Sequence, residues 1–164
     1  MPRVTHVKKA RKDIPHAGIK AGEPYYWWKF KNCGKSVSKN YPKRSQLTRS
    51  EYYKFVYDLQ DDNGTTPDFD DLQGKIEDIV SSLEDNKSEQ EDKLNNMPES
   101  LRYAPSGETI QERIDNLDDA ISELQSITID EDFDDGLDEE ALEAAKVERA
   151  DEVWSSVADA ISNL

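Results

Sequence analysis

The chain has 164 residues, of which 35% are charged and 35% hydrophobic, and its mean hydropathy is −0.92. So little apolar material excludes one large globular core but suits an elongated helical body with narrow apolar seams. The formal net charge of −15 hides a sharp division: residues 1–50 carry a net +11 and residues 51–164 a net −26. This division predicts two parts with different partners, or two parts that attract each other. The alternative is a solvated acidic body with an incidental basic tail.

The basic third predicts a small hairpin module. Residues 1–22 are broken by Pro and Gly and suggest an arm or irregular loop, whereas residues 24–31 (PYYWWKFK) are typical of a strand. The sequence NCG at residues 32–34 is expected to turn the chain into a second short strand near residues 35–39. Two strands alone are marginal in water, so we expect support from a helix at residues 45–60, which Thr48-x-x-Glu51 would cap.

The acidic remainder predicts three helices. Thr66 and Pro67 are typical of the start of the first, whose apolar register passes through polar Lys87 and Gln90. A connector with two prolines follows, and Thr109 begins a second capping box. The last helix comes after an acidic loop at residues 130–140. The fold class is therefore expected to be α+β, mainly α, with a hairpin module at residues 1–62 and an acidic antiparallel helical hairpin or three-helix bundle at residues 66–164.

Cysteine and hydropathy patterns indicate a soluble protein of the cytoplasm. A lone Cys33 cannot form an internal disulfide, and no apolar run approaches the ~18 residues of a membrane helix. An enzyme is not expected, because no nucleophile elbow, no Cys/His pairing with an orienting carboxylate and no phosphate-binding glycine loop is visible. Most carboxylates should lie on solvated helix faces, where nothing raises a pKa.

Neither metal ions nor other cofactors are expected. A structural zinc site needs four Cys or His ligands, whereas the chain offers only Cys33, His6 and His16. Asp130, Asp132 and Asp134 have the spacing of a calcium loop. However, Asp135 stands where that loop requires Gly and Ala141 where it requires Glu, so an acidic linker is the preferred interpretation.

The candidate binding face is the basic, aromatic one. Basic side chains neutralise phosphates and exposed aromatic rings stack on bases, so nucleic acid or an acidic protein is the expected partner. In the alternative interpretation, one aromatic set forms a small core and the lysines merely solubilise the module. The candidate residues are Lys8, Lys9, Arg11, Lys12, Trp28, Lys29, Phe30, Lys31, Lys43 and Arg44.

The acidic half carries a second candidate surface. Rows of carboxylates on a rigid helix can imitate the phosphates of DNA, so the chain could instead inhibit a host DNA-binding or defence protein. A third possibility is a structural protein that forms homo-oligomers through the heptad-like apolar seams. The residues of the candidate acidic face are Glu77, Asp78, Glu84, Asp85, Glu89, Glu91 and Asp92.

Several short motifs carry a resemblance. HVKKARK at residues 6–12, IKAGEPY at residues 19–25 and NMPESLRYAPSGE at residues 96–108 resemble a largely uncharacterised group of bacteriophage proteins. These begin with a zinc-ribbon-like module and continue into acidic helices. The metal ligands are missing here, since residues 13–16 read DIPH where a Cys-x-x-Cys is expected and residues 37–42 hold no cysteine. The resemblance implies a ribbon that has lost its zinc, in a phage protein of the host cytoplasm.

The preferred function combines these features. We expect a phage-encoded, non-enzymatic accessory protein whose basic aromatic face contacts nucleic acid or an acidic partner. Its acidic helices would engage a host protein.

Overall fold

The computed structural model describes residues 1–130, 132–134, 136 and 138–164. The fold class is α+β and mainly α, as predicted. The chain divides into two compact units, Met1–Asp58 and Leu59–Leu164. This division falls within helix α1 (Glu51–Asp62), slightly before the boundary that the sequence predicts.

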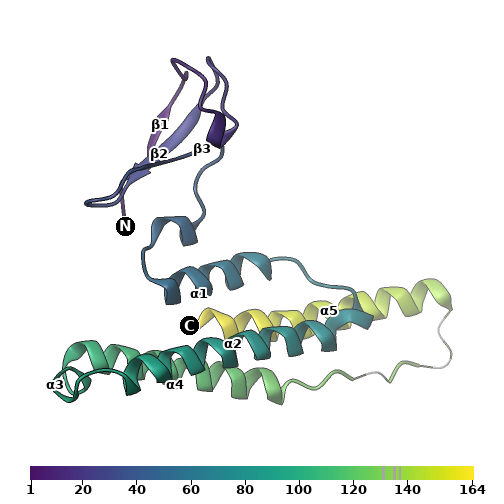
Figure 1. Ribbon diagram of the computed structural model, residues 1–164. Coiled ribbons are helices and arrows are strands. Elements are labelled where there is room, and N and C mark those ends of the chain that lie inside the picture. The colour runs from purple at the N-terminus through teal and green to yellow at the C-terminus, as the bar shows by residue number, and fades with distance from the viewer. Residues whose placement is uncertain (131, 135, 137) are drawn as a thin grey trace. The chain divides into compact units, whose positions relative to one another are not determined.

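The first unit contains a three-stranded antiparallel sheet with the strand order β1-β2-β3 (Figure 1). The strands are β1 (Thr5–Val7), β2 (Tyr25–Lys29) and β3 (Lys35–Ser38). The turn between β2 and β3 lies where NCG predicts it, with Asn32 at a φ of 63° and the Cys33 N–H donating to the Phe30 carbonyl at 3.2 Å. Asn tolerates this left-handed conformation better than most residues.

The arm or irregular loop expected at residues 1–22 is only partly correct, because residues 5–7 form β1 whereas most of residues 8–22 form a loop. Thr5 pairs with Trp27 and Val7 with Tyr25, so β1 is formed by a partner far along the chain. The loop contains a short 3₁₀ helix, η1 (Pro15–Ala17), and an isolated bridge between Ile14 and Ile19. Ile19 is 1% exposed and belongs to the core of the unit. A strand of three residues is too short to show the alternation of apolar and polar residues from which strands are predicted, so the sequence did not indicate β1.

The helix predicted at residues 45–60 is two elements. A 3₁₀ helix, η2 (Arg44–Leu47), buries Ser45 and Leu47, and α1 begins only at Glu51. The Thr48 capping box is also wrong, because the Oγ1 of Thr48 accepts from the N–H of Ser50 at 3.2 Å. The Oγ of Ser50 in turn accepts from the N–H of Tyr53 at 3.4 Å. Ser50 therefore caps the helix that the sequence assigned to Thr48.

The second unit is built on two long antiparallel helices, α2 (Leu72–Asn95) and α4 (Pro105–Ser126), joined at one end by the short α3 (Glu99–Arg102) (Figure 1). A third long helix, α5 (Glu139–Ser162), packs on both. The predicted apolar stripes face inward and form the core: Leu72, Ile76, Ile79 and Leu83 on α2, Ile114, Leu117, Ile121 and Leu124 on α4, and Val153, Val157 and Ile161 on α5.

The helix starts differ from the predictions. A 3₁₀ turn, η3 (Phe69–Asp71), precedes α2, so Thr66 is not its cap. Helix α4 begins at Pro105, and the hydroxyl of Thr109 lies within its first turns, where it donates to the Pro105 carbonyl at 2.8 Å. In both cases a helix-start signal was assigned to the wrong residue, because nearby residues also favour helix starts.

Polar groups also hold the second unit together. Gln90, which the sequence places in the apolar register, is 1% exposed, and Lys87 of α2 forms an ion pair with Asp118 of α4. The indole of Trp154 donates to the Asn63 carbonyl at 3.0 Å, and the side-chain amide of Gln60 donates to the Ile161 carbonyl at 3.2 Å. These two bonds attach the end of α1, from Leu59 onward part of the second unit, and the residue that follows it to helix α5.

Candidate nucleic-acid interface

A cleft of about 480 Å³ opens in the first unit where β2 ends. One wall comes from the residues that follow the strand, and another from the segment between η2 and α1. We call it the basic cleft. It is lined by Met1, Pro2, Lys29, Phe30, Lys31, Leu47, Thr48, Arg49 and Tyr57. It therefore combines cations with an apolar floor, and no carboxylate is among these lining residues.

Trp28 fixes the geometry of the cleft but is not part of its surface. It is 4% exposed, and its indole N–H donates to the Gln46 carbonyl of η2 at 3.1 Å. This bond holds η2, and with it Leu47, against the sheet. Trp28 was predicted to contact the ligand, and its burial corrects that prediction. Because successive strand residues point to opposite faces, Trp28 is in the core while its neighbour Trp27 is half-buried.

Replacing Trp28 with phenylalanine tests this anchoring role. The variant keeps an apolar ring but leaves the Gln46 carbonyl without its donor, so we expect the free energy of unfolding to fall by roughly 1–3 kcal/mol. Urea denaturation followed by circular dichroism measures the change. Trp27→Phe is the matched control, expected within about 0.5 kcal/mol of wild type because its side chain is only half-buried. Equal losses of unfolding free energy in the two variants would contradict the anchoring role of Trp28.

The three cations of the cleft, Lys29, Lys31 and Arg49, form no ion pair with a carboxylate among the residues that the structure describes. Lys29 also stands directly across the sheet from Lys35. Like charges at such a position destabilise a sheet. An anionic ligand would remove this repulsion.

A stack of side chains stands beside the cleft. The guanidinium of Arg44 lies 4.2 Å from the ring centre of Tyr57. The ring of Tyr53 stacks with that of Tyr57 at 6.1 Å, with 24° between the planes. Stacking of this kind orients a guanidinium while leaving its N–H groups in the plane available to an anion. Arg44 is thus prepositioned next to the three cations of the cleft.

Aromatic side chains also occupy both faces of the sheet. On one face, Lys35 Nζ lies 4.1 Å from the ring centre of Trp27. On the other, His6 stacks on Tyr26 at 4.8 Å, and Tyr26 meets the edge of Tyr41 at 5.4 Å. Tyr41 is 64% exposed. None of these side chains lines the cleft.

The structure brings together only some of the residues predicted for this interface. Lys29, Phe30 and Lys31 line the cleft, and Arg44 lies beside it through Tyr57. Lys43 is exposed just before η2. The predicted basic run, Lys8, Lys9, Arg11 and Lys12, is exposed in the loop after β1 and does not line the cleft.

Six lining residues were not among the predicted site residues: Met1, Pro2, Leu47, Thr48, Arg49 and Tyr57. Arg49 was visible as an added charge before the helix. Tyr57 could have been found from its spacing of four residues from Tyr53, which places both rings on one helix face.

The predicted acidic face of α2 is solvent-exposed throughout. Two of its columns repeat every seven residues, Glu77, Glu84 and Glu91 in one and Asp78, Asp85 and Asp92 in the other. Glu89 is exposed as well and pairs with Lys93 at 3.6 Å. The face is a regular array of carboxylates.

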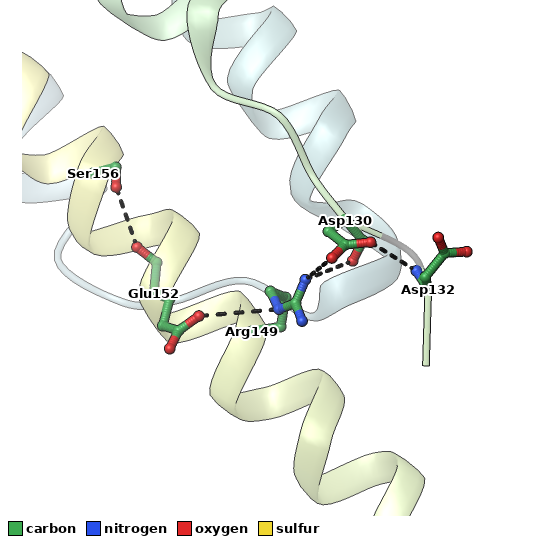
Figure 2. A network of polar contacts seen from close by, with 5 residues as sticks. All are labelled: Asp130, Asp132, Arg149, Glu152 and Ser156. Carbon is green, nitrogen blue, oxygen red and sulfur yellow. Dashed lines mark hydrogen bonds and ion pairs between the residues drawn. The ribbon is translucent and has the colours of Figure 1, made fainter. Parts of the chain in front are cut away.

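The acidic linker between α4 and α5 is attached to α5 by Arg149 (Figure 2). Arg149 Nη1 lies 2.8 Å from Asp130 Oδ2, and the backbone N–H of Asp132 donates to Asp130 Oδ1 at 3.0 Å. Among the described residues no cluster of three or more His, Cys, Asp or Glu is arranged to hold a metal ion. Asp135, which stands at the glycine position of the calcium-loop pattern, lies outside the described residues.

The contact between Arg149 and Asp130 should make the stability of the fold depend on pH. The hydrogen bond from Arg149, followed by that from the Asp132 N–H, lowers the pKa of Asp130. The contact therefore stabilises the fold above the ordinary Asp pKa of about 3.9 and is lost as the pH falls through the lowered, folded-state pKa. Arg149→Gln should raise the pKa of Asp130, measured by carboxyl ¹³C NMR, whereas Glu152→Gln should not. An unchanged Asp130 pKa in Arg149→Gln would refute the contact.

No described helix is both long and apolar enough to cross a membrane. Searches against protein-family models, curated proteins and solved structures found no match to this chain.

Proposed function

We propose that this chain is a non-enzymatic nucleic-acid-binding protein, a phage-encoded accessory factor acting in the host cytoplasm, and that the basic cleft is its binding site. The carrying observation is the cluster Lys29, Lys31 and Arg49, without ion-pair partners among the described residues, around an apolar floor. Lysine and arginine neutralise phosphates, and an aromatic ring between them suits a base. An acidic protein surface would use the cations but would leave Phe30 without a matching group.

The test is binding of the full chain to a labelled oligonucleotide, followed by fluorescence anisotropy across a salt series. Three to four phosphate contacts predict that the logarithm of the binding constant falls with the logarithm of salt concentration, with a slope of about −2 to −3. Poly-glutamate serves as the competitor. No binding at about 20 mM salt would refute the proposal, and equal competition by poly-glutamate would assign the cleft to an acidic protein.

A second candidate function rests on the acidic face of α2. Its two exposed columns span fourteen residues, or about 21 Å of helix, with carboxylates at a regular repeat. This array suits a basic, DNA-binding host protein. The test is whether the chain displaces duplex DNA from a non-specific DNA-binding protein, and whether Glu→Gln changes at Glu77, Glu84 and Glu91 remove that effect. Failure of the wild-type chain to displace DNA at low salt would refute it.

Assembly through the apolar seams has less support. The stripes of α2 and α4 that would pair with another copy are buried against each other within one chain. Oligomerisation through them would require the two helices to separate.

A further inference from the structure

The shape of the basic cleft limits which nucleic acids can use it fully. The cleft is open to solvent on one side, and its volume of about 480 Å³ lies in the range of small-ligand sites. Phe30 is half-buried and Leu47 is 7% exposed, so the apolar floor is recessed behind the cations. A paired duplex presents phosphates on a convex surface and keeps its base faces stacked inside. Only an unpaired base can reach such a floor.

The rings of the cleft differ in what they can offer a base. Arg44 and Tyr53 both stack on Tyr57, so Tyr57 has neighbours for its ring faces within the protein. Phe30 forms no ring pair with another described residue. Phe30 is therefore the ring in this cleft that a base can stack on. Lys29 and Lys31 adjoin it in the chain, and Arg49 comes from the opposite side.

We infer that the basic cleft takes one unpaired base of a single strand on Phe30, with the phosphates of the strand around that base at Lys29, Lys31 and Arg49. The chain would then bind single strands in preference to duplexes. This inference rests on the proposed function and adds to it the strand state of the ligand and the residue that selects it. The shared chemistry is an unpaired base with phosphates on both sides, which single-stranded DNA and RNA both supply.

The experiment measures the affinity of the full chain for a thymidine octamer, a uridine octamer, a duplex of equal length, an abasic octamer and thymidine monophosphate. We expect at least about tenfold tighter binding of one single strand than of the duplex or the abasic strand, as one stacked base would give. A deoxyuridine octamer, which differs from the uridine octamer in the sugar alone, shows which sugar is preferred. Phe30→Leu, which keeps apolar volume, should lose about tenfold for the single strand and little for the abasic strand. Trp27→Leu is the matched control.

The outcomes separate the two proposals. No binding to any oligonucleotide would refute the proposed function itself. Equal affinity for the single strand, the duplex and the abasic strand would overturn the inference while leaving nucleic-acid binding intact. Binding of the monophosphate as tightly as the octamer would also overturn it, because the cleft would then serve a free nucleotide. If circular dichroism shows that Phe30→Leu does not fold, the affinities of the wild-type chain for the thymidine octamer and the abasic octamer still test whether a base is bound.

Discussion

Replacing Lys29, Lys31 and Arg49 together with glutamine is expected to weaken binding of a single-stranded oligonucleotide by roughly hundredfold at about 50 mM salt. The three side chains line one cleft, are without ion-pair partners among the described residues, and come from two segments that Trp28 holds together. Each phosphate contact contributes about −0.7 to the salt slope of a single-strand complex. The slope should therefore become less steep by about 2. Fluorescence anisotropy across a salt series measures both effects.

The matched control removes the same charge elsewhere in the unit. Lys8, Lys9 and Lys12 are exposed in the loop after β1 and lie outside the cleft. Their replacement by glutamine should change affinity by less than about fivefold, through the general field of the module alone. Equal losses in the two triple variants would show that binding is diffuse, which would contradict a defined site.

Gly107→Ala is expected to lower the free energy of unfolding by roughly 2–4 kcal/mol. Gly107 lies in the first turn of α4, where α3 approaches so closely that an added Cβ would lie 2.6 Å from the Arg102 carbonyl carbon. The obstacle is backbone and cannot rotate away, so α3 or the helix start must shift. Overpacking of this kind costs about 1–3 kcal/mol, and the displaced backbone bonds of α3 add to it. Urea denaturation followed by circular dichroism measures the loss.

Gly74→Ala provides the opposite control within the same unit. Gly74 is the third residue of α2, as Gly107 is of α4, and an added Cβ there would meet nothing within 4 Å. Alanine favours a helix over glycine by about 0.5–1 kcal/mol, so this variant should be more stable than wild type. If the two variants changed stability in the same direction, the close approach at Gly107 would be refuted.

The sequence predicted the elements whose signals are local. The apolar spacing of α2, α4 and α5 identified three helices that the structure contains, and NCG identified the turn between β2 and β3. Each signal depends on residues within a few positions of one another, so these elements can be predicted without knowledge of the fold. The capping residues were predicted less well. Thr48 and Ser50 both favour the start of α1, and only the structure shows that Ser50 is the cap.

The parts that were missed depend on distant partners. Strand β1 exists because Thr5 and Val7 meet β2, and nothing within residues 5–7 indicates this. The orientation of β2 is a similar case. Tyr-Tyr-Trp-Trp offers an aromatic pair to each face, and the burial of Trp28 is set by the carbonyl of Gln46, eighteen residues later. Of the predicted binding residues, Lys29, Phe30 and Lys31 line the cleft, whereas Trp28 is buried.

The fold groups a few of the many basic residues of the first unit in one cleft. Residues 1–58 carry fourteen Lys and Arg against four Asp and Glu, a formal charge of +10, and composition alone could not say which of these cations act together. Lys31 and Arg49 line the same cleft because the hydrogen bond from Trp28 to Gln46 holds η2 against the sheet. Local charge density thus arises from tertiary packing rather than from the longest basic run in the sequence.

An NMR titration of the uniformly ¹⁵N-labelled full chain with a thymidine octamer shows whether a single strand occupies the basic cleft. If it does, the backbone amides of Phe30, Lys31 and Arg49 and the side-chain N–H signal of Arg44 shift first and saturate together. The amides of α2 and the basic run at residues 8–12 should remain near their free positions. Shifts that are strongest at residues 8–12, or absent from the cleft while binding is seen by anisotropy, would contradict the account.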